Sequence, residues 1–195
     1  MTNSIFLLGL YANHPRAALR RAVDSRPIGF AFLIFVCSYL SHAVGTLIQS
    51  PAGSEQLLFR LVGLLPVQMA FGLIVLLLSA CIIHFTATLA GENGNAISTI
   101  VFLAINSAPY LLMTPAALLF STLGVSRLIL LFGVGMGLWI FVFILNVIGA
   151  QENYSMSFGK AFLVVAAPYL FLSGCLTVLG MSPFYLLVVF LLGSA

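Results

Sequence analysis

Charged side chains are scarce in this sequence. Only 6% of its 195 residues are charged, whereas about a quarter of the residues of an ordinary soluble domain are charged. Hydrophobic residues make up 62% of the chain, and no water-soluble fold could bury so much apolar surface. The composition therefore excludes a soluble domain and predicts an integral membrane protein.

The sequence also lacks the signatures of an enzyme or a metal site. It contains no G-x-S-x-G or H-E-x-x-H motif and no glycine-rich phosphate loop. The three cysteines, Cys37, Cys81 and Cys175, lie inside apolar runs, where a thiol behaves as a small hydrophobe. Cys81 and His84 would supply two ligands one helical turn apart, without the third or fourth that zinc requires. We expect a protein that is not an enzyme and holds no cofactor or metal.

Long apolar runs without strict alternation predict transmembrane helices and not barrel strands, because a spanning helix needs about 20 apolar residues. We expect an all-α integral membrane protein in which residues 27–195 form one helical bundle. Five runs have the required length: Ile28–Ile48, Leu61–Leu89, Ala96–Phe120, Leu128–Gly149 and Phe158–Gly180. The apolar tail Phe184–Leu192 is too short to cross alone, and we interpret it as a bent or re-entrant end.

Residues 1–26 combine a short apolar stretch with a basic one. Four arginines lie in this leader: Arg16, Arg20, Arg21 and Arg26. We predict an amphipathic interfacial helix, or a helix pair broken at Pro15, on an anionic membrane surface. The alternative is a disordered basic segment. Because the arginines follow the apolar stretch Ile5–Tyr11, a cleaved signal peptide is not expected.

The distribution of basic residues predicts the orientation of the bundle. With the N-terminus in the cytoplasm, the four leader arginines and Lys160 lie inside, and Arg60 and Arg127 lie outside. The positive-inside rule favours this arrangement by five residues to two. The pI of about 9.0 therefore reflects membrane topology, and we expect the lipid bilayer, and no nucleic acid, as a partner.

Polar side chains within the runs are the first candidates for function, because each must find a partner in lipid. They are few: His42, Gln68, His84, Asn106 and Asn146. Their depths permit the pairs His42 with Gln68 and His84 with Asn146, each of which would bridge two helices for about 1 kcal/mol. Since the five do not share one depth, the sequence does not gather them into one site.

An internal repeat is visible in the third and fifth runs. The segment Ser107–Leu111, SAPYL, recurs 59 residues later as Ala166–Leu170, AAPYL. Pro109 and Pro168 occupy the same place in the two copies and would kink both helices near mid-membrane. Such paired kinks are found at transporter substrate sites, but they also serve simply to shape packing.

Gly133 and Gly137 lie four residues apart in the fourth run. This spacing predicts a seam of small residues at which another helix approaches closely. The alternative is that these glycines merely loosen the helix. Contacts between transmembrane helices would also allow a homo-oligomer or a hetero-oligomer.

Several segments resemble the bacterial branch of the Yip-domain family, the Ypt/Rab-GTPase-interacting membrane proteins. They are PRAALR in the leader, Arg26-Pro27, GENGNAIS before APYL, Trp139, and SFGKAFLVVAAPYL. The resemblance implies a five-span bundle of the bacterial inner membrane with a cytoplasmic N-terminus and an adaptor or scaffold function. Eukaryotic members bind prenylated Rab GTPases and carry a long N-terminal region with a D-L-Y-G-P-type motif. Because this chain shows neither feature, we do not expect a GTPase partner.

An enzyme or enzyme accessory is the least favoured of three classes of function, and two others remain in view. One is a non-catalytic membrane adaptor or scaffold, favoured by the missing chemistry and the basic leader. The other is a small transporter or channel subunit, favoured by the repeat and the paired prolines. A polar cavity reaching mid-membrane would favour transport, whereas a tightly packed bundle would favour the adaptor.

The predicted orientation is testable with reporter fusions. Fusions at Met1, Gly94 and Asn153 should report the cytoplasm, because the arginine cluster before Pro27 places the N-terminus there and each pair of spans returns the chain to that side. Fusions at Gly53 and Val125 should report the opposite side. A cytoplasmic signal at Gly53 would overturn the topology.

Overall fold

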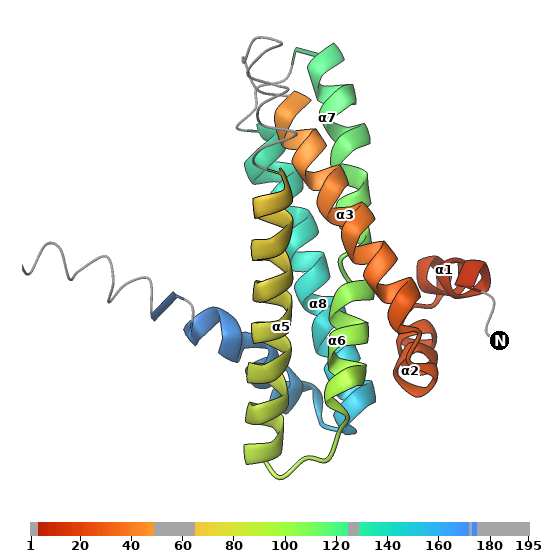
Figure 1. Ribbon diagram of the computed structural model, residues 1–195, viewed down its shortest axis with the longest axis vertical. Helices are drawn as coiled ribbons and strands as arrows, with labels where there is room; N and C mark the ends of the chain where they lie inside the picture. The colour runs from red at the N-terminus through yellow and green to blue at the C-terminus, as the bar shows by residue number, and fades with distance from the viewer. Residues whose placement is uncertain (1–3, 49–64, 125–128, 172, 175–195) are drawn as a thin grey trace, which may run out of the picture.

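The computed structural model describes residues 4–48, 65–124, 129–171 and 173–174, and in these ranges the chain is helical apart from short connections (Figure 1). The leader forms α1 (Ser4–Asn13) and α2 (Pro15–Ser25). The bundle contains α3 (Ile28–Ile48), α5 (Leu65–Leu89), α6 (Ala96–Ile105), the 3₁₀ helix η2 (Ala108–Leu112), α7 (Met113–Thr122), the π-helix η3 (Ile129–Val134) and α8 (Gly135–Tyr154). A shorter apolar helix, Phe158–Phe171, follows.

Four helical stretches in the described residues are long and apolar enough to cross a membrane: Ile28–Gly45, Leu65–Leu89, Ala96–Thr122 and Phe132–Tyr154. They correspond to the first four predicted spans, and α3 has the predicted bounds. The fifth predicted span is described as a helix only from Phe158 to Phe171. Its remainder and the tail Phe184–Leu192 lie outside the described residues.

The third span is broken, as its prolines require. α6 ends at Ile105, the chain tightens into η2 around Pro109, and α7 resumes at Met113. Proline interrupts a helix because it lacks the N–H group and clashes with the preceding turn. Pro168 is different, since it lies inside the continuous Phe158–Phe171 helix. The two copies of the repeat therefore differ in backbone structure.

The polar segment at residues 151–157 is helical as far as Tyr154. α8 continues to Tyr154 and ends at Ser155, which adopts a left-handed conformation with φ 52°. Asn153 and Tyr154 are buried because both form hydrogen bonds inside the bundle. Polarity alone does not distinguish a surface loop from a buried polar helix end.

α6 lies at the centre of the bundle. Seven of its ten residues are buried, and it packs against α2, α3, α5 and α8 (Figure 1). Its first turn is capped by Asn95, whose side chain accepts hydrogen bonds from the N–H groups of Ile97 and Ser98. Asn95 and Asn153 also bond each other, which joins the 90–95 connection to the end of α8. We call this the leader end of the bundle, because α2 also packs on α8 near it.

The leader is a helix pair broken at His14 and Pro15, one of the two helical forms predicted. The apolar face of α2, formed by Ala18, Leu19 and Ala22, is fully buried against the bundle. In α1, Leu7 is buried in the same way and Leu10 is partly buried. These side chains therefore pack against protein.

The predicted glycine seam does not form among the described residues. Gly133 and Gly137 are exposed, and a Cβ added at Gly137 would meet no described atom within 4 Å. Close approach occurs instead at Gly149, where a Cβ would lie 2.6 Å from the Phe102 ring, and at Gly45, where it would lie 2.8 Å from the Met113 carbonyl oxygen. Gly137 thus faces outward, while Gly149 lets α8 approach α6.

This contrast gives a matched pair of variants on one helix. Gly149→Ala should lower stability by roughly 1–3 kcal/mol, because Phe102 must move to accommodate the new methyl group. Gly137→Ala should be neutral or stabilising by up to about 1 kcal/mol, because alanine favours helix and meets no neighbour. Thermal unfolding in mild detergent measures both. Equal shifts for the two variants would contradict the packing described.

Candidate functional site

A cavity of about 390 Å³ lies inside the bundle between α3, α5, η2 and α8. Its lining residues fall near the middle of each helical stretch, as Ser38 does in α3 and Val142 in the fourth span. The cavity is therefore at mid-membrane depth if the four stretches cross the bilayer. Its volume lies at the lower end of the range of about 300–1,000 Å³ for small-molecule sites.

The α3 wall of the cavity follows the helical repeat. Phe35, Ser38, Tyr39 and His42 line it, and their spacing of three and four residues places them on one face of α3. Ser38 is only 1% exposed, yet its Oγ has no hydrogen-bond partner. The Nδ1 atom of His42, one turn away, is also buried without a partner. Two unsatisfied polar atoms thus lie next to one another on this wall.

Aromatic rings form much of the remaining wall. Trp139 of α8 packs edge-on against Tyr169, with ring centroids 5.5 Å apart. His42 packs edge-on against Tyr110 of η2 at 5.7 Å. Phe71 of α5 also lines the cavity. Since these rings come from five helical segments, the cavity depends on their mutual packing.

Asn146 contributes the polar group of the α8 wall. Its side-chain oxygen accepts a hydrogen bond of 3.0 Å from Asn106 Nδ2, and Asn106 Oδ1 accepts one of 3.1 Å from the Tyr11 hydroxyl. Tyr11 belongs to α1, so a chain of two hydrogen bonds connects the leader to the cavity. Burial raises the pKa of Tyr11 well above its usual value of about 10. Tyr11 therefore remains a donor at neutral pH, and this contribution to stability is lost only as the pH rises above about 10.

A second polar cluster closes the leader end of the bundle. The Tyr154 hydroxyl lies 2.6 Å from Thr99 Oγ1 and 2.9 Å from His84 Nδ1. Asn153 Nδ2 also donates to Thr99 Oγ1 at 3.0 Å. These bonds satisfy the cluster internally, so it joins α5, α6 and α8 and leaves no group directed at a ligand.

Both predicted polar pairs are wrong. His84 bonds Tyr154, and Asn146 bonds Asn106, because the helices bring other partners closer. Gln68 is exposed and makes no hydrogen bond to His42. His42 and Asn146 nevertheless line the same cavity. The sequence did not identify Ser38 or Tyr11, whose types are ordinary in apolar helices and at their ends.

The two predicted prolines lie apart from the unsatisfied atoms. Pro109 and Pro168 are both buried, and each precedes a tyrosine of the cavity wall, Tyr110 and Tyr169. The break at Pro109 places Tyr110 beside His42. The repeated Pro-Tyr pair therefore supplies one aromatic side chain from each copy.

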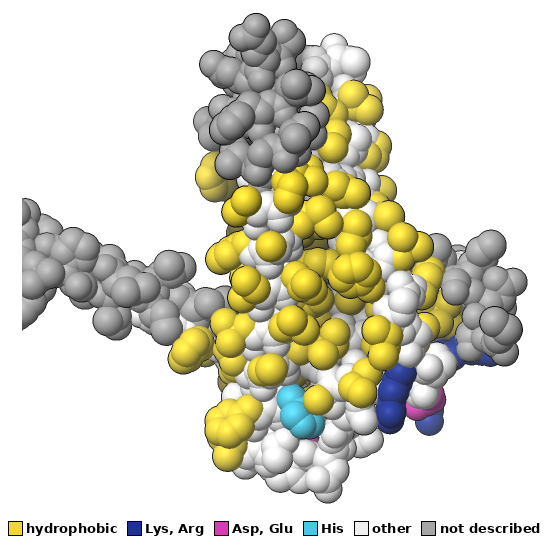
Figure 2. All heavy atoms as spheres, viewed as in Figure 1, with side chains coloured by type: hydrophobic (Ala, Val, Ile, Leu, Met, Phe, Trp, Pro, Cys, Tyr) yellow, Lys and Arg dark blue, Asp and Glu magenta, His cyan; other side chains and the backbone are white. Residues whose placement is uncertain are grey.

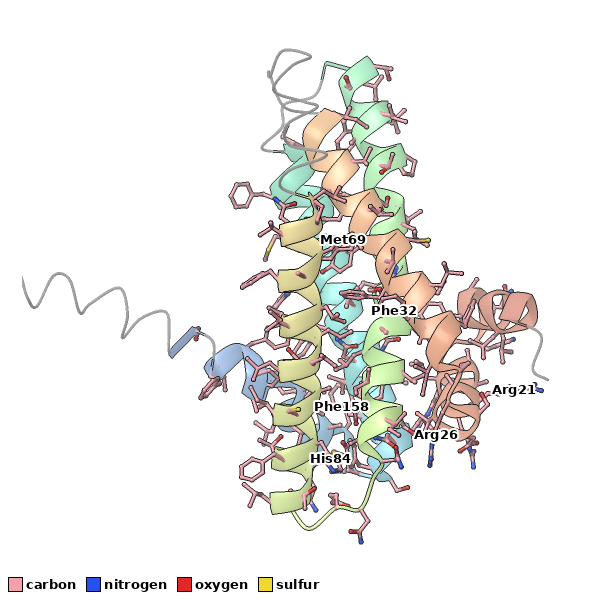
Figure 3. All side chains as sticks on the ribbon, viewed as in Figure 1. Arg21, Arg26, Phe32, Met69, His84 and Phe158 are labelled. Atoms are coloured by element: carbon pink, nitrogen blue, oxygen red, sulfur yellow. The ribbon has the colours of Figure 1, made fainter. Side chains whose placement is uncertain are left out.

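The leader arginines are exposed. Arg16 forms an ion pair of 2.6 Å with Glu152, and Lys160 forms one of 2.7 Å with Glu92. Arg21 extends away from the bundle (Figure 3). Hydrophobic side chains cover the face of α3 and α5, and charged ones gather beside α2 (Figure 2). Binding of these arginines to a membrane surface stays a prediction.

In the ranges of the chain that the structure describes, the arrangement is suited to binding. No cluster of three His, Cys, Asp or Glu side chains occurs in those ranges. Comparison with protein-family models, with curated proteins and with solved structures yields no match to this chain. The resemblance to the Yip-domain family therefore rests on the quoted sequence segments alone.

The bond from the leader to the bundle is testable through Tyr11. Tyr11→Phe removes the donor to Asn106 and should lower stability by about 1 kcal/mol. The leader should then be released more often, which limited trypsin digestion after Arg16 or Arg20 would detect. Asn13→Ala is the matched control, because Asn13 bonds only Gly9 within α1. Equal cleavage of the two variants would show that the Tyr11 bond does not hold the leader.

Proposed function

We propose that this chain is a membrane-embedded binding protein for a small, mainly apolar molecule, and acts as a small transporter or a subunit of one. The observation that carries the proposal is the mid-bundle cavity with two unsatisfied polar atoms, Ser38 Oγ and His42 Nδ1. A cavity at this depth with polar side chains on its wall favours transport over a tightly packed adaptor.

The unsatisfied atoms are informative because they are costly. A buried polar group without a partner costs about 1–3 kcal/mol, and in a membrane water does not readily offset that cost. Elsewhere along α3, Ser41 is fully engaged with Leu111 and Thr114 of the adjoining segment. α3 thus carries one serine, Ser41, that bonds a neighbouring segment, and another, Ser38, whose hydroxyl has no partner in the bundle. A bound molecule would supply that partner.

A route to the cavity supports the same function. Phe71, Trp139 and Tyr169 line the cavity and are also exposed on the outside of the bundle, by 65%, 40% and 37%. Their positions mark a mouth on the apolar surface. A hydrophobic molecule would therefore reach the cavity sideways from the bilayer, without crossing water.

A membrane adaptor is the second candidate function. Two observations favour it: α2 docks firmly on the bundle, and its arginines remain outside. The resemblance to the Yip-domain family favours the same function, at the bacterial inner membrane and with a cytoplasmic N-terminus. This proposal requires a partner at the exposed face of the leader and does not use the cavity.

The experiment that tests the proposed function is native mass spectrometry of the full chain extracted from membranes in mild detergent. The wild-type protein should retain a small-molecule adduct. Ser79→Phe should abolish retention, because Ser79 lines the cavity and the larger ring would fill it. Leu78→Phe is the matched control on the outer face of the same helix. Adducts retained equally by both variants would exclude the cavity as the binding site.

A further inference from the structure

The lining of the cavity restricts the chemical class of its ligand, an inference that rests on the proposed function. Among the residues that the structure describes, none that lines the cavity is Asp, Glu, Lys or Arg. A charged group brought into this space would have no opposite charge to pair with, and its desolvation would be very costly. The part of the ligand that enters must therefore be uncharged.

The polar wall favours an acceptor oxygen on the ligand. The Ser38 hydroxyl is a donor, and His42 Nδ1 is a donor in one of its two neutral tautomers. The two residues lie one turn apart on the same face of α3, so both can approach one group. A carbonyl oxygen suits this set of donors.

The aromatic walls favour a flat group. Phe35, Tyr39, Phe71, Tyr110, Trp139 and Tyr169 all line the cavity. Aromatic rings pack well against a planar partner in stacked or edge-to-face geometry. A branched or bulky head would lose this contact. An apolar tail would leave through the mouth at Phe71 and Trp139 and continue into lipid.

We infer that the ligand is a neutral amphipathic molecule with a planar, carbonyl-bearing head, the chemistry of a quinone. Its head lies between the aromatic walls and accepts hydrogen bonds from Ser38 and His42. Its tail extends into the bilayer. Binding requires no covalent or redox step.

Trp139 makes the inference measurable, because it is the single tryptophan of the chain and lines the cavity. Full-length protein in nanodiscs is titrated with decyl-ubiquinone, which should quench Trp139 fluorescence saturably. The neutral ketone 2-decanone should compete for the site. Decane, decyltrimethylammonium, and decanoate at about pH 8, where the carboxylate is ionised, should not compete. The Ser79→Phe protein provides the background from quinone dissolved in lipid.

Two serines three residues apart on α3 provide matched variants. Ser38→Ala should weaken quinone binding about 3- to 10-fold, the effect of one hydrogen bond, without lowering the melting temperature, because Ser38 has no protein partner. Ser41→Ala should lower the melting temperature and leave affinity unchanged, because Ser41 bonds Leu111 and Thr114 outside the cavity. His42→Phe keeps a ring in place and should weaken binding to a similar extent as Ser38→Ala.

The possible failures are distinct. In one outcome, quenching of the wild type rises linearly without saturation, equals the Ser79→Phe background, and is not reduced by any competing probe. This result would overturn the proposed function together with this inference. In another outcome, quinone binding is saturable, but charged amphiphiles or decane displace the quinone as well as 2-decanone does. This result would overturn only the assignment of a neutral, carbonyl-bearing head to the ligand. The same holds if Ser38→Ala and His42→Phe both bind as the wild type does.

Discussion

The bundle depends on one constraint, that the polar groups of its central helix must be satisfied by other parts of the chain. Lipid offers no hydrogen bonds, so each unsatisfied group there is expensive. Ser98 of α6 donates to the Val23 carbonyl of α2, and Thr99 bonds Tyr154 of α8. Asn106, just beyond the end of α6, bonds both Tyr11 and Asn146. The positions of the leader and of α8 are thereby fixed relative to α6.

The same constraint links the leader to the cavity. Asn106 holds Tyr11 of α1 on one side and Asn146 of the cavity wall on the other. If the leader separated from the bundle, Asn106 would lose one partner and its hold on Asn146 would weaken. Occupancy of the cavity and docking of the leader therefore share a residue. In this respect the two candidate functions, ligand binding and contact at the leader, are physically connected.

Hydropathy predicted where the helices lie better than it predicted which side chains pair between them. The span Ile28–Ile48 and the break at Pro109 follow from local chemistry, which the sequence records directly. Pairing depends on how helices rotate and approach one another, and depth alone misassigned His84 and Asn146. Gly137 fits a packing pattern but faces outward, whereas Gly149 fits no pattern and touches Phe102. Only the three-dimensional arrangement distinguishes these cases.

The residues of the cavity could not be predicted from the sequence, for a related reason. Serine is common in membrane helices because its hydroxyl can bond the preceding turn or a neighbouring helix, so neither Ser38 nor Ser41 stands out. What separates them is geometry: Ser41 meets a partner across α3 and the η2–α7 segment, while the buried Ser38 Oγ meets none. The bundle satisfies its other described buried side-chain polar atoms internally. Ser38 Oγ and His42 Nδ1, on one face of α3, are the exceptions among the described residues. Because alanine would fit at this position without the loss of a hydrogen bond, Ser38 adds nothing to the internal hydrogen bonding of the bundle, whereas Ser41 does.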